Sequence, residues 1–169
     1  MCETLKVKAG DIFPVIEELI QMGSKVWITV TGMSMYPFLR EEKDCVQLAG
    51  TDFKAVEKGD IVLVRRVTGE YVLHRVQRKR ANAFFMIGDA QSWVEGPVFP
   101  EQLLAKVEYV RRNGRDISCG RPVLKLLALA WLNIIPVRRY ILRVIRISGN
   151  IKQRVKKEGK SRRCKIENT

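Results

Sequence analysis

Histidine and paired cysteines are scarce in this chain of 169 residues. The single histidine is His74, and the four cysteines are scattered without a Cys-x-x-Cys pair. This pattern predicts neither a zinc site nor a disulfide framework, and it favours reduced thiols in a cytoplasmic protein. We therefore expect no metal and no other cofactor.

Long apolar runs are also missing. Residues 1–10 are polar and charged, without the apolar core of a signal peptide. The uncharged stretch 126–137 is interrupted by Asn133 and Pro136, and it is shorter than the ~20 residues that a helix needs to cross a bilayer. We expect one compact domain with an appendage, and no segment that spans a membrane.

Acidic residues are few near the C-terminus. From Arg121 onward, 14 lysines and arginines face two acidic residues, a net charge of +12, whereas the first 120 residues carry a net +1. After Pro136 the pattern predicts a two-faced helix. Its apolar side is expected to hold Val137, Tyr140, Ile141, Val144 and Ile145, and its basic side Arg138, Arg139, Arg143 and Arg146. Residues 152–165 are mostly charged and are expected to be disordered.

Three interpretations of this basic tail remain open. A basic amphipathic helix suits an anionic membrane surface, which residues 121–151 would contact. The second interpretation docks the apolar face on the β-domain or on a second subunit, so the oligomeric state is left open. Nucleic-acid binding is less favoured, because the tail offers few aromatic residues beyond Trp131 and Tyr140 on which bases could stack.

The first 120 residues read as short strands separated by turn residues, which predicts a mainly β, antiparallel fold. A helix from Asp11 to about Met22, ended by Gly23, is expected first, with Ile12, Val15, Ile16, Leu19 and Ile20 on one face. The expected strands are 26–30, 45–48, 61–65, 71–76, 84–87 and 105–110, with a helical turn over 100–104. The chain then divides into an N-terminal helical segment, 1–24, a domain, 25–118, and a helical basic tail, 119–169.

The strand 26–30 runs into Thr31-Gly32-Met33-Ser34-Met35-Tyr36-Pro37. Gly32 allows a close backbone approach and Pro37 restricts the path that follows, so a serine is delivered into a tight, irregular turn. Taken alone, Ser34 is an ordinary turn residue.

Two further features change that interpretation. A serine hydroxyl needs a nearby base to become a nucleophile, and His74 offers the only imidazole, within the strand Val72-Leu73-His74-Arg75-Val76. A half-buried structural histidine is the simpler alternative. Asp89 follows the strand 84–87 in Ile87-Gly88-Asp89, where its carboxylate can orient an imidazole or hold the neighbouring loop.

Taken in order, these motifs, with Lys58-Gly59-Asp60-Ile61-Val62 between them, resemble the signal peptidase I and repressor peptidase (S24/S26) superfamily over roughly residues 25 to 112. The resemblance implies an antiparallel β fold and a serine endopeptidase in which Ser34 is the nucleophile and Asp89 the acidic residue. Many members activate the serine with lysine. His74 fits the archaeal and endoplasmic-reticulum branch, which uses histidine.

By this likeness, Ser34 attacks the scissile carbonyl of an extended peptide, His74 carries the proton, and residues of the loop, Thr31, Gly32, Met33, Met35 and Pro37, contact oxyanion or substrate. Two departures stand out. A second serine often precedes the nucleophile by two positions in signal peptidases, and here Gly32 stands there. The family's Gly-Asp after the serine loop is replaced by Arg40-Glu41-Glu42-Lys43-Asp44.

Signal peptidases act outside the cytoplasm, and no N-terminal membrane anchor is expected here. Either the tail binds the membrane while the domain stays cytoplasmic, or the substrates are cytoplasmic. Two other functions remain possible. One is a non-cleaving or self-cleaving regulatory protein on the same fold, and the other is nucleic-acid binding through the tail.

Overall fold

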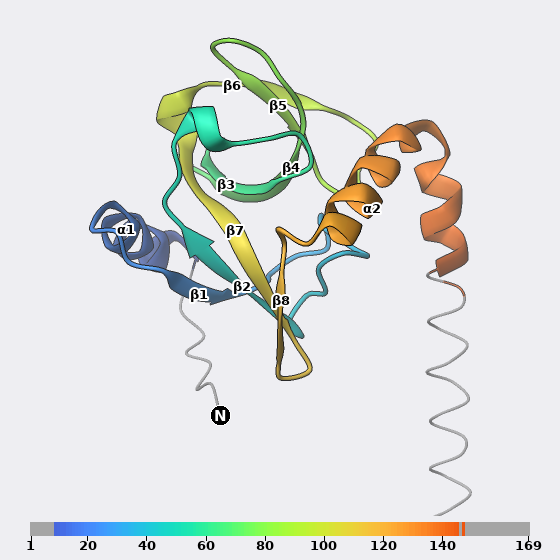
Figure 1. Ribbon diagram of the computed structural model, residues 1–169, viewed down its shortest axis with the longest axis horizontal. Coiled ribbons are helices and arrows are strands. Elements are labelled where there is room, and N and C mark those ends of the chain that lie inside the picture. The colour runs from blue at the N-terminus through green and yellow to red at the C-terminus, as the bar shows by residue number, and fades with distance from the viewer. Residues whose placement is uncertain (1–8, 146, 148–169) are drawn as a thin grey trace, which may run out of the picture.

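The computed structural model describes residues 9–145 and residue 147, so residues 152–165 of the expected disordered tail lie outside the described part. The described chain forms a strongly curved antiparallel sheet flanked by helices at opposite sides (Figure 1). The strand order is β1-β2-β7-β3-β4-β5-β6, and β8 pairs with β7. The strands are β1 (Val26–Thr29), β2 (Asp44–Ala49), β3 (Ile61–Arg65), β4 (Tyr71–Lys79), β5 (Phe84–Ile87), β6 (Glu95–Val98), β7 (Leu103–Arg112) and β8 (Arg115–Ser118). The expected mainly β, antiparallel fold is confirmed.

Strand β3 separates two hydrophobic cores. Side chains of a strand alternate between its faces, and four consecutive residues of β3 are buried. Ile61 and Leu63 belong to a core that includes β1, β2 and β7, whereas Val62 and Val64 belong to a second core with residues of β4, β5 and β6. This two-sided burial explains why residues 61–65 form an uninterrupted apolar run in the sequence.

The N-terminal helix α1 (Ala9–Gln21) begins two residues before the expected cap, so Asp11 lies inside it. The helix ends as expected, because Gly23 takes a φ of +80° and its N–H donates to the carbonyl of Ile20. The expected apolar face is wrong in part. Ile16 and Ile20 are buried, whereas Ile12, Val15 and Leu19 are exposed.

Several elements were not expected from the sequence. Strand β6 contains Gly96 and Pro97, which read as a turn, yet its place at the end of the strand order accommodates a proline that has no N–H to donate. The 3-10 helices Phe53–Ala55 and Pro100–Gln102 flank the sheet strands, and the second agrees with the expected helical turn. The uncharged stretch is mostly helix α2 (Pro122–Asn133).

A second helical segment, residues 135–145 and 147, follows α2 after a turn at Ile134 and runs back beside it (Figure 1). We call these two helices the C-terminal hairpin. The expected faces of the second helix are wrong in part: Arg139 and Arg143 are exposed as expected. Arg138 and Leu142 are buried, whereas Val137 and Tyr140 are exposed. Among the described helices, none combines the length and the apolar character needed to cross a bilayer.

Candidate active site

The serine loop, residues 30–44, is closed by backbone hydrogen bonds at its base. The N–H of Val30 donates to the carbonyl of Asp44, and the N–H of Glu42 donates to the carbonyl of Val30. The side chains of Met35 and Leu39 are 2% and 1% exposed, and both belong to the core. The loop is therefore anchored at its base and at its centre, and Ser34 stands beside the central anchor.

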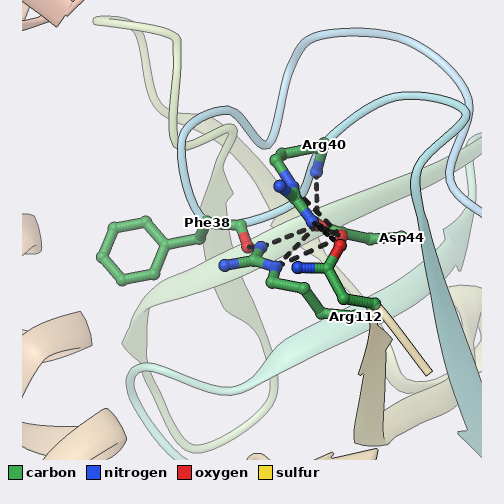
Figure 2. Close-up of polar contacts among 5 residues, drawn as sticks. Phe38, Arg40, Asp44 and Arg112 are labelled. Carbon is green, nitrogen blue, oxygen red and sulfur yellow. Dashed lines mark hydrogen bonds and ion pairs between the residues drawn. The ribbon is translucent and has the colours of Figure 1, made fainter. Parts of the chain in front are cut away.

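Asp44 forms the polar centre of this loop (Figure 2). Its fully buried carboxylate accepts hydrogen bonds from the guanidinium groups of Arg40 and Arg112, and Arg112 also donates to the carbonyl of Phe38. Burial alone would raise the pKa of Asp44, but the hydrogen bonds from Arg112 and Arg40 outweigh it and hold the pKa below its ordinary value. Asp44 thus builds the turn for which the family usually has Gly-Asp.

His74 lies on β4 opposite Val62 of β3 and is only 2% exposed. Burial lowers the pKa of His74 below its ordinary value of 6.5, because the imidazolium loses hydration. The imidazole is consequently neutral at physiological pH, the state that a general base requires.

A third segment, residues 88–91, joins the serine to the histidine. Arg75 pairs with Ile87 across β4 and β5, and His74 and Gly88 are the next residues of the two segments beyond this pair. The N–H of Ala90 donates to the carbonyl of Ser34 at 2.7 Å. A Cβ at Gly88 would lie 2.7 Å from that same carbonyl oxygen, so only glycine fits this approach. Gly88 therefore contacts the backbone of Ser34 and directly follows β5, the strand that pairs with the strand of His74.

Asp89 does not hold the imidazole in this arrangement. Its fully buried carboxylate accepts two hydrogen bonds from Arg75, from Nε at 2.9 Å and from Nη2 at 2.7 Å. Arg75 also donates to the carbonyl of Gly59 at 2.7 Å and lies over the ring of Phe38. Of the two roles considered for Asp89, the contacts favour that of holding the neighbouring loop.

Glu95, at the start of β6, supplies the carboxylate nearest to the imidazole nitrogen Nδ1. Its Oε2 lies 3.5 Å from His74 Nδ1, the outer limit of a hydrogen bond, and Nδ1 has no hydrogen-bond partner among the described residues. Arg66 binds both oxygens of Glu95 at 2.5 and 2.7 Å and holds the pKa of Glu95 below its ordinary value. Glu95 is therefore ionised and fixed in orientation beside the histidine.

The remaining predicted loop residues differ in exposure. Thr31 and Met33 are exposed, while Pro37 is half-buried and Met35 lies in the core. Gly32 takes a φ of +79°, and its N–H donates to the Glu41 carboxylate at 2.9 Å. Within the described chain the N–H of Ser34 donates no hydrogen bond, so the main-chain donor available at the serine hydroxyl is that of Ser34 rather than that of Gly32.

A cavity of about 310 Å³ lies between the serine loop and α2. Its lining includes Phe38, Ile61, Leu124 and Ala128, and neither Ser34 nor His74 contributes to it. Pro37 of the serine loop and Arg75, the neighbour of His74, do line it, so the cavity adjoins the candidate site.

Sequence reasoning did not find the residues that support this site, namely Glu95, Arg66, Arg75 and Arg138. Glu95 comes near His74 through the β4–β5–β6 pairings, which no local motif encodes. Arg138 left a detectable signal, because it shares the helix face of Leu142 and Ile145 at spacings of four and seven. A charged residue on an apolar helix face indicates a buried, hydrogen-bonded charge.

The antiparallel sheet, with an N-terminal helix and C-terminal helices, is consistent with an S24-like fold. A family model described as Peptidase S24-like matches residues 3–102. Because this match covers more than half of the chain, the protein belongs to the Peptidase S24-like family. No curated protein matches the sequence.

Proposed function

We propose that this protein is a serine endopeptidase of the histidine type, in which Ser34 is the nucleophile and His74 the general base. Membership of a serine-peptidase family supports the reaction class. The observation that carries the residue assignment is the junction at Gly88. Gly88 lies against the carbonyl of Ser34, and it directly follows β5, which pairs with the strand of His74.

The reaction follows from the chemistry of these groups. As Ser34 Oγ bonds to the scissile carbonyl carbon, its proton passes to His74, and the carbonyl oxygen becomes an oxyanion that the N–H of Ser34 can stabilise. The protonated His74 gives its proton to the departing amine, which leaves an ester on Ser34. Water, deprotonated by His74, then releases the acid product. Glu95 stabilises the transient imidazolium electrostatically, and Asp89 acts indirectly by holding Arg75.

An extended peptide is the substrate class that best suits the site. Strand β1 stands at one end of the strand order and leads directly into the serine loop. Its outer edge has no partner strand within the described sheet, so a peptide can add alongside it with its carbonyl near Ser34.

Cleavage of a peptide library with small residues before the scissile bond tests this proposal, with mass spectrometry as the readout. Ser34→Ala and His74→Ala should each abolish cleavage while the circular dichroism spectrum is unchanged. Ser24→Ala, an exposed serine after α1, is the matched control and should retain full activity. Full activity of a folded Ser34→Ala protein would exclude Ser34 as the nucleophile.

The family includes self-cleaving proteins, so intramolecular cleavage is the second candidate. The purified chain, incubated alone at several concentrations, distinguishes the two. A rate of self-processing that is independent of concentration, together with an intact peptide library, favours the self-cleaving regulator over an endopeptidase that acts on other chains.

For the C-terminal hairpin we propose contact with an anionic membrane surface. On α2, Val123, Leu126 and Leu127 are spaced by three and four residues and are half or more exposed. This apolar stripe lies in the part of the chain that carries the net +12, and basic charge around an apolar stripe complements anionic headgroups.

Co-sedimentation with vesicles of anionic and of neutral phospholipid tests this contact. Binding to anionic vesicles should fall at least tenfold in Leu126→Asp. Val67→Asp, at a residue 94% exposed on a turn far from the hairpin in sequence, makes the same kind of change and should bind normally. If both variants lost vesicle binding equally, the binding would depend on net charge alone and not on the apolar stripe.

A further inference from the structure

Arg138 is a fully buried arginine that the proposed reaction does not use. Its Nη1 donates to the carbonyls of Gly88 and Gln91, both at 3.1 Å, and its Nη2 donates to the carbonyl of Trp131 at 2.9 Å. A guanidinium is costly to bury, and these three hydrogen bonds offset part of that cost, whereas Nε has no hydrogen-bond partner among the described residues. Two of these three acceptors belong to the segment that contacts Ser34.

Trp131 of α2 makes a second contact with the same segment. Its indole Nε1 donates to the carbonyl of Asp89 at 3.1 Å, and its ring meets Phe38 edge-on at 5.6 Å between centroids. The carbonyls of Gly88, Asp89 and Gln91 are thus all held by the C-terminal hairpin. The N–H of Ala90, between them, points the other way and binds the carbonyl of Ser34.

We propose that the C-terminal hairpin is part of the active site, with Arg138 and Trp131 as positioning residues that fix residues 88–91 and, through Ala90, the backbone of Ser34. The proposal rests on the proposed peptidase function. Three hydrogen bonds from two helical residues hold the turn, and one hydrogen bond from Ala90 joins it to Ser34. A small displacement of this turn would be transmitted to the nucleophile, whose alignment controls the rate.

The alternative is that the hairpin only stabilises the fold. A merely stabilising contact lowers the melting temperature of a variant but leaves kcat of the folded fraction unchanged. A positioning contact lowers kcat at temperatures where the variant is fully folded, with little change in KM, and it loosens the hydrogen bond from Ala90 to Ser34. The two possibilities therefore differ in two measurable quantities.

The experiment uses the full chain with Arg138→Met, Arg138→Lys and the matched control Arg139→Met. Arg139 is exposed and bonds the neighbouring Tyr140 hydroxyl, so its loss makes the same change of charge without touching the turn. We expect kcat to fall at least tenfold in Arg138→Met and to recover in part in Arg138→Lys, because an ammonium reaches fewer of the three carbonyls. Arg139→Met should match the wild type.

Trp131→Phe keeps an aromatic ring at this position but removes the Nε1 donor together with the five-membered ring of the indole, and it is the second variant if Arg138→Met does not fold. Its kcat should fall several-fold. Amide hydrogen exchange at Ala90, followed by NMR, is the second readout. It should be at least tenfold faster in Arg138→Met or Trp131→Phe than in Arg139→Met. Folded variants with unchanged Ala90 exchange and unchanged kcat overturn the proposal.

Exchange at Ala90 needs no catalysis, so the two proposals can fail separately. If Ser34→Ala still cleaves peptides, the proposed function fails. In that case, faster Ala90 exchange in the Arg138 variants still supports the hold on the turn. If Ser34→Ala abolishes cleavage and the Arg138 and Trp131 variants behave like Arg139→Met, only the positioning role fails.

Discussion

Replacing Gly88 by alanine tests the closest approach in the candidate site. The added Cβ would lie 2.7 Å from the carbonyl oxygen of Ser34 and 2.7 Å from Oε1 of Gln91, whereas ordinary contact begins at 3.4 Å. The Gln91 side chain can rotate away. The Ser34 oxygen belongs to the backbone, so the serine loop must move by roughly 0.7 Å to restore ordinary contact.

This displacement sets the expected magnitudes. A shift approaching 1 Å at a reacting group costs about 10²-fold in rate, so kcat/KM for Gly88→Ala should fall about 10- to 100-fold. Overpacking costs about 1–3 kcal/mol of unfolding free energy, measured by urea denaturation. Because the φ of Gly88 is not among the positive ones, these losses come from crowding rather than from backbone strain.

Gly120→Ala is the matched control. Its Cβ would lie 3.5 Å from the Ser118 hydroxyl, an ordinary contact, and its φ is likewise not positive. It should keep wild-type activity and stability. If Gly88→Ala also kept both, the turn would have room to spare, and the close coupling between Gly88 and Ser34 would be refuted.

Three other predictions follow from the charges. Asp44→Asn should cost about 3 kcal/mol in urea unfolding at neutral pH, because it breaks a buried ion pair, whereas Asp116→Asn, in an exposed pair, should cost much less. Because the pKa of Asp44 is lowered in the folded state, this stabilisation is present above about pH 4 and is lost as pH falls through the folded-state pKa. The unfolding free energies of the wild type and Asp44→Asn should therefore converge in strong acid. A difference that stays constant with pH would contradict the assignment. The acid limb of the kcat/KM profile should lie below pH 6.5, because burial lowers the pKa of His74. Glu95→Gln should move this limb to still lower pH, because the charge of Glu95 raises the pKa of His74. A limb above pH 8 would indicate another base. Burial raises the pKa of the Cys119 thiol to about 11, so its alkylation at pH 8 should be more than tenfold slower than that of free cysteine, and equal rates would show the thiol to be accessible.

Much of the sheet could be predicted because its strands are local patterns. Residues 61–65 and 84–87 match β3 and β5 residue for residue, since each is an apolar run closed by turn residues. Strand β6 escaped prediction because Gly96 and Pro97 signal a turn in the sequence, while the end of a sheet tolerates them. Local patterns also placed Ser34 and His74 at a strand end and within a strand.

The supporting residues depend on register and tertiary packing, which local patterns do not carry. Glu95 reaches His74 because Met86 pairs with Glu95 while Val76 pairs with Met86, a sequence of two non-local pairings. Arg138 was assigned to the solvated face because arginines are usually exposed. The three carbonyl groups that accept hydrogen bonds from Arg138 offset part of the cost of burying its charge. They belong to residues 7 to 50 positions away in the sequence.

Two carboxylates lie near His74, and each is paired with its own arginine: Asp89 with Arg75, and Glu95 with Arg66. Arg66 also pairs with Glu70, so it is shared between two carboxylates, whereas Arg75 serves Asp89. Burial is the largest influence on the pKa of His74, and it lowers that pKa despite the charges of Glu95 and Asp89. In the proposed reaction, the imidazolium would therefore depend on Glu95, at 3.5 Å from Nδ1, because Asp89 is committed to the buried turn. Under that mechanism, the carboxylate that the motif points to builds the site, and the one that the motif omits assists the chemistry.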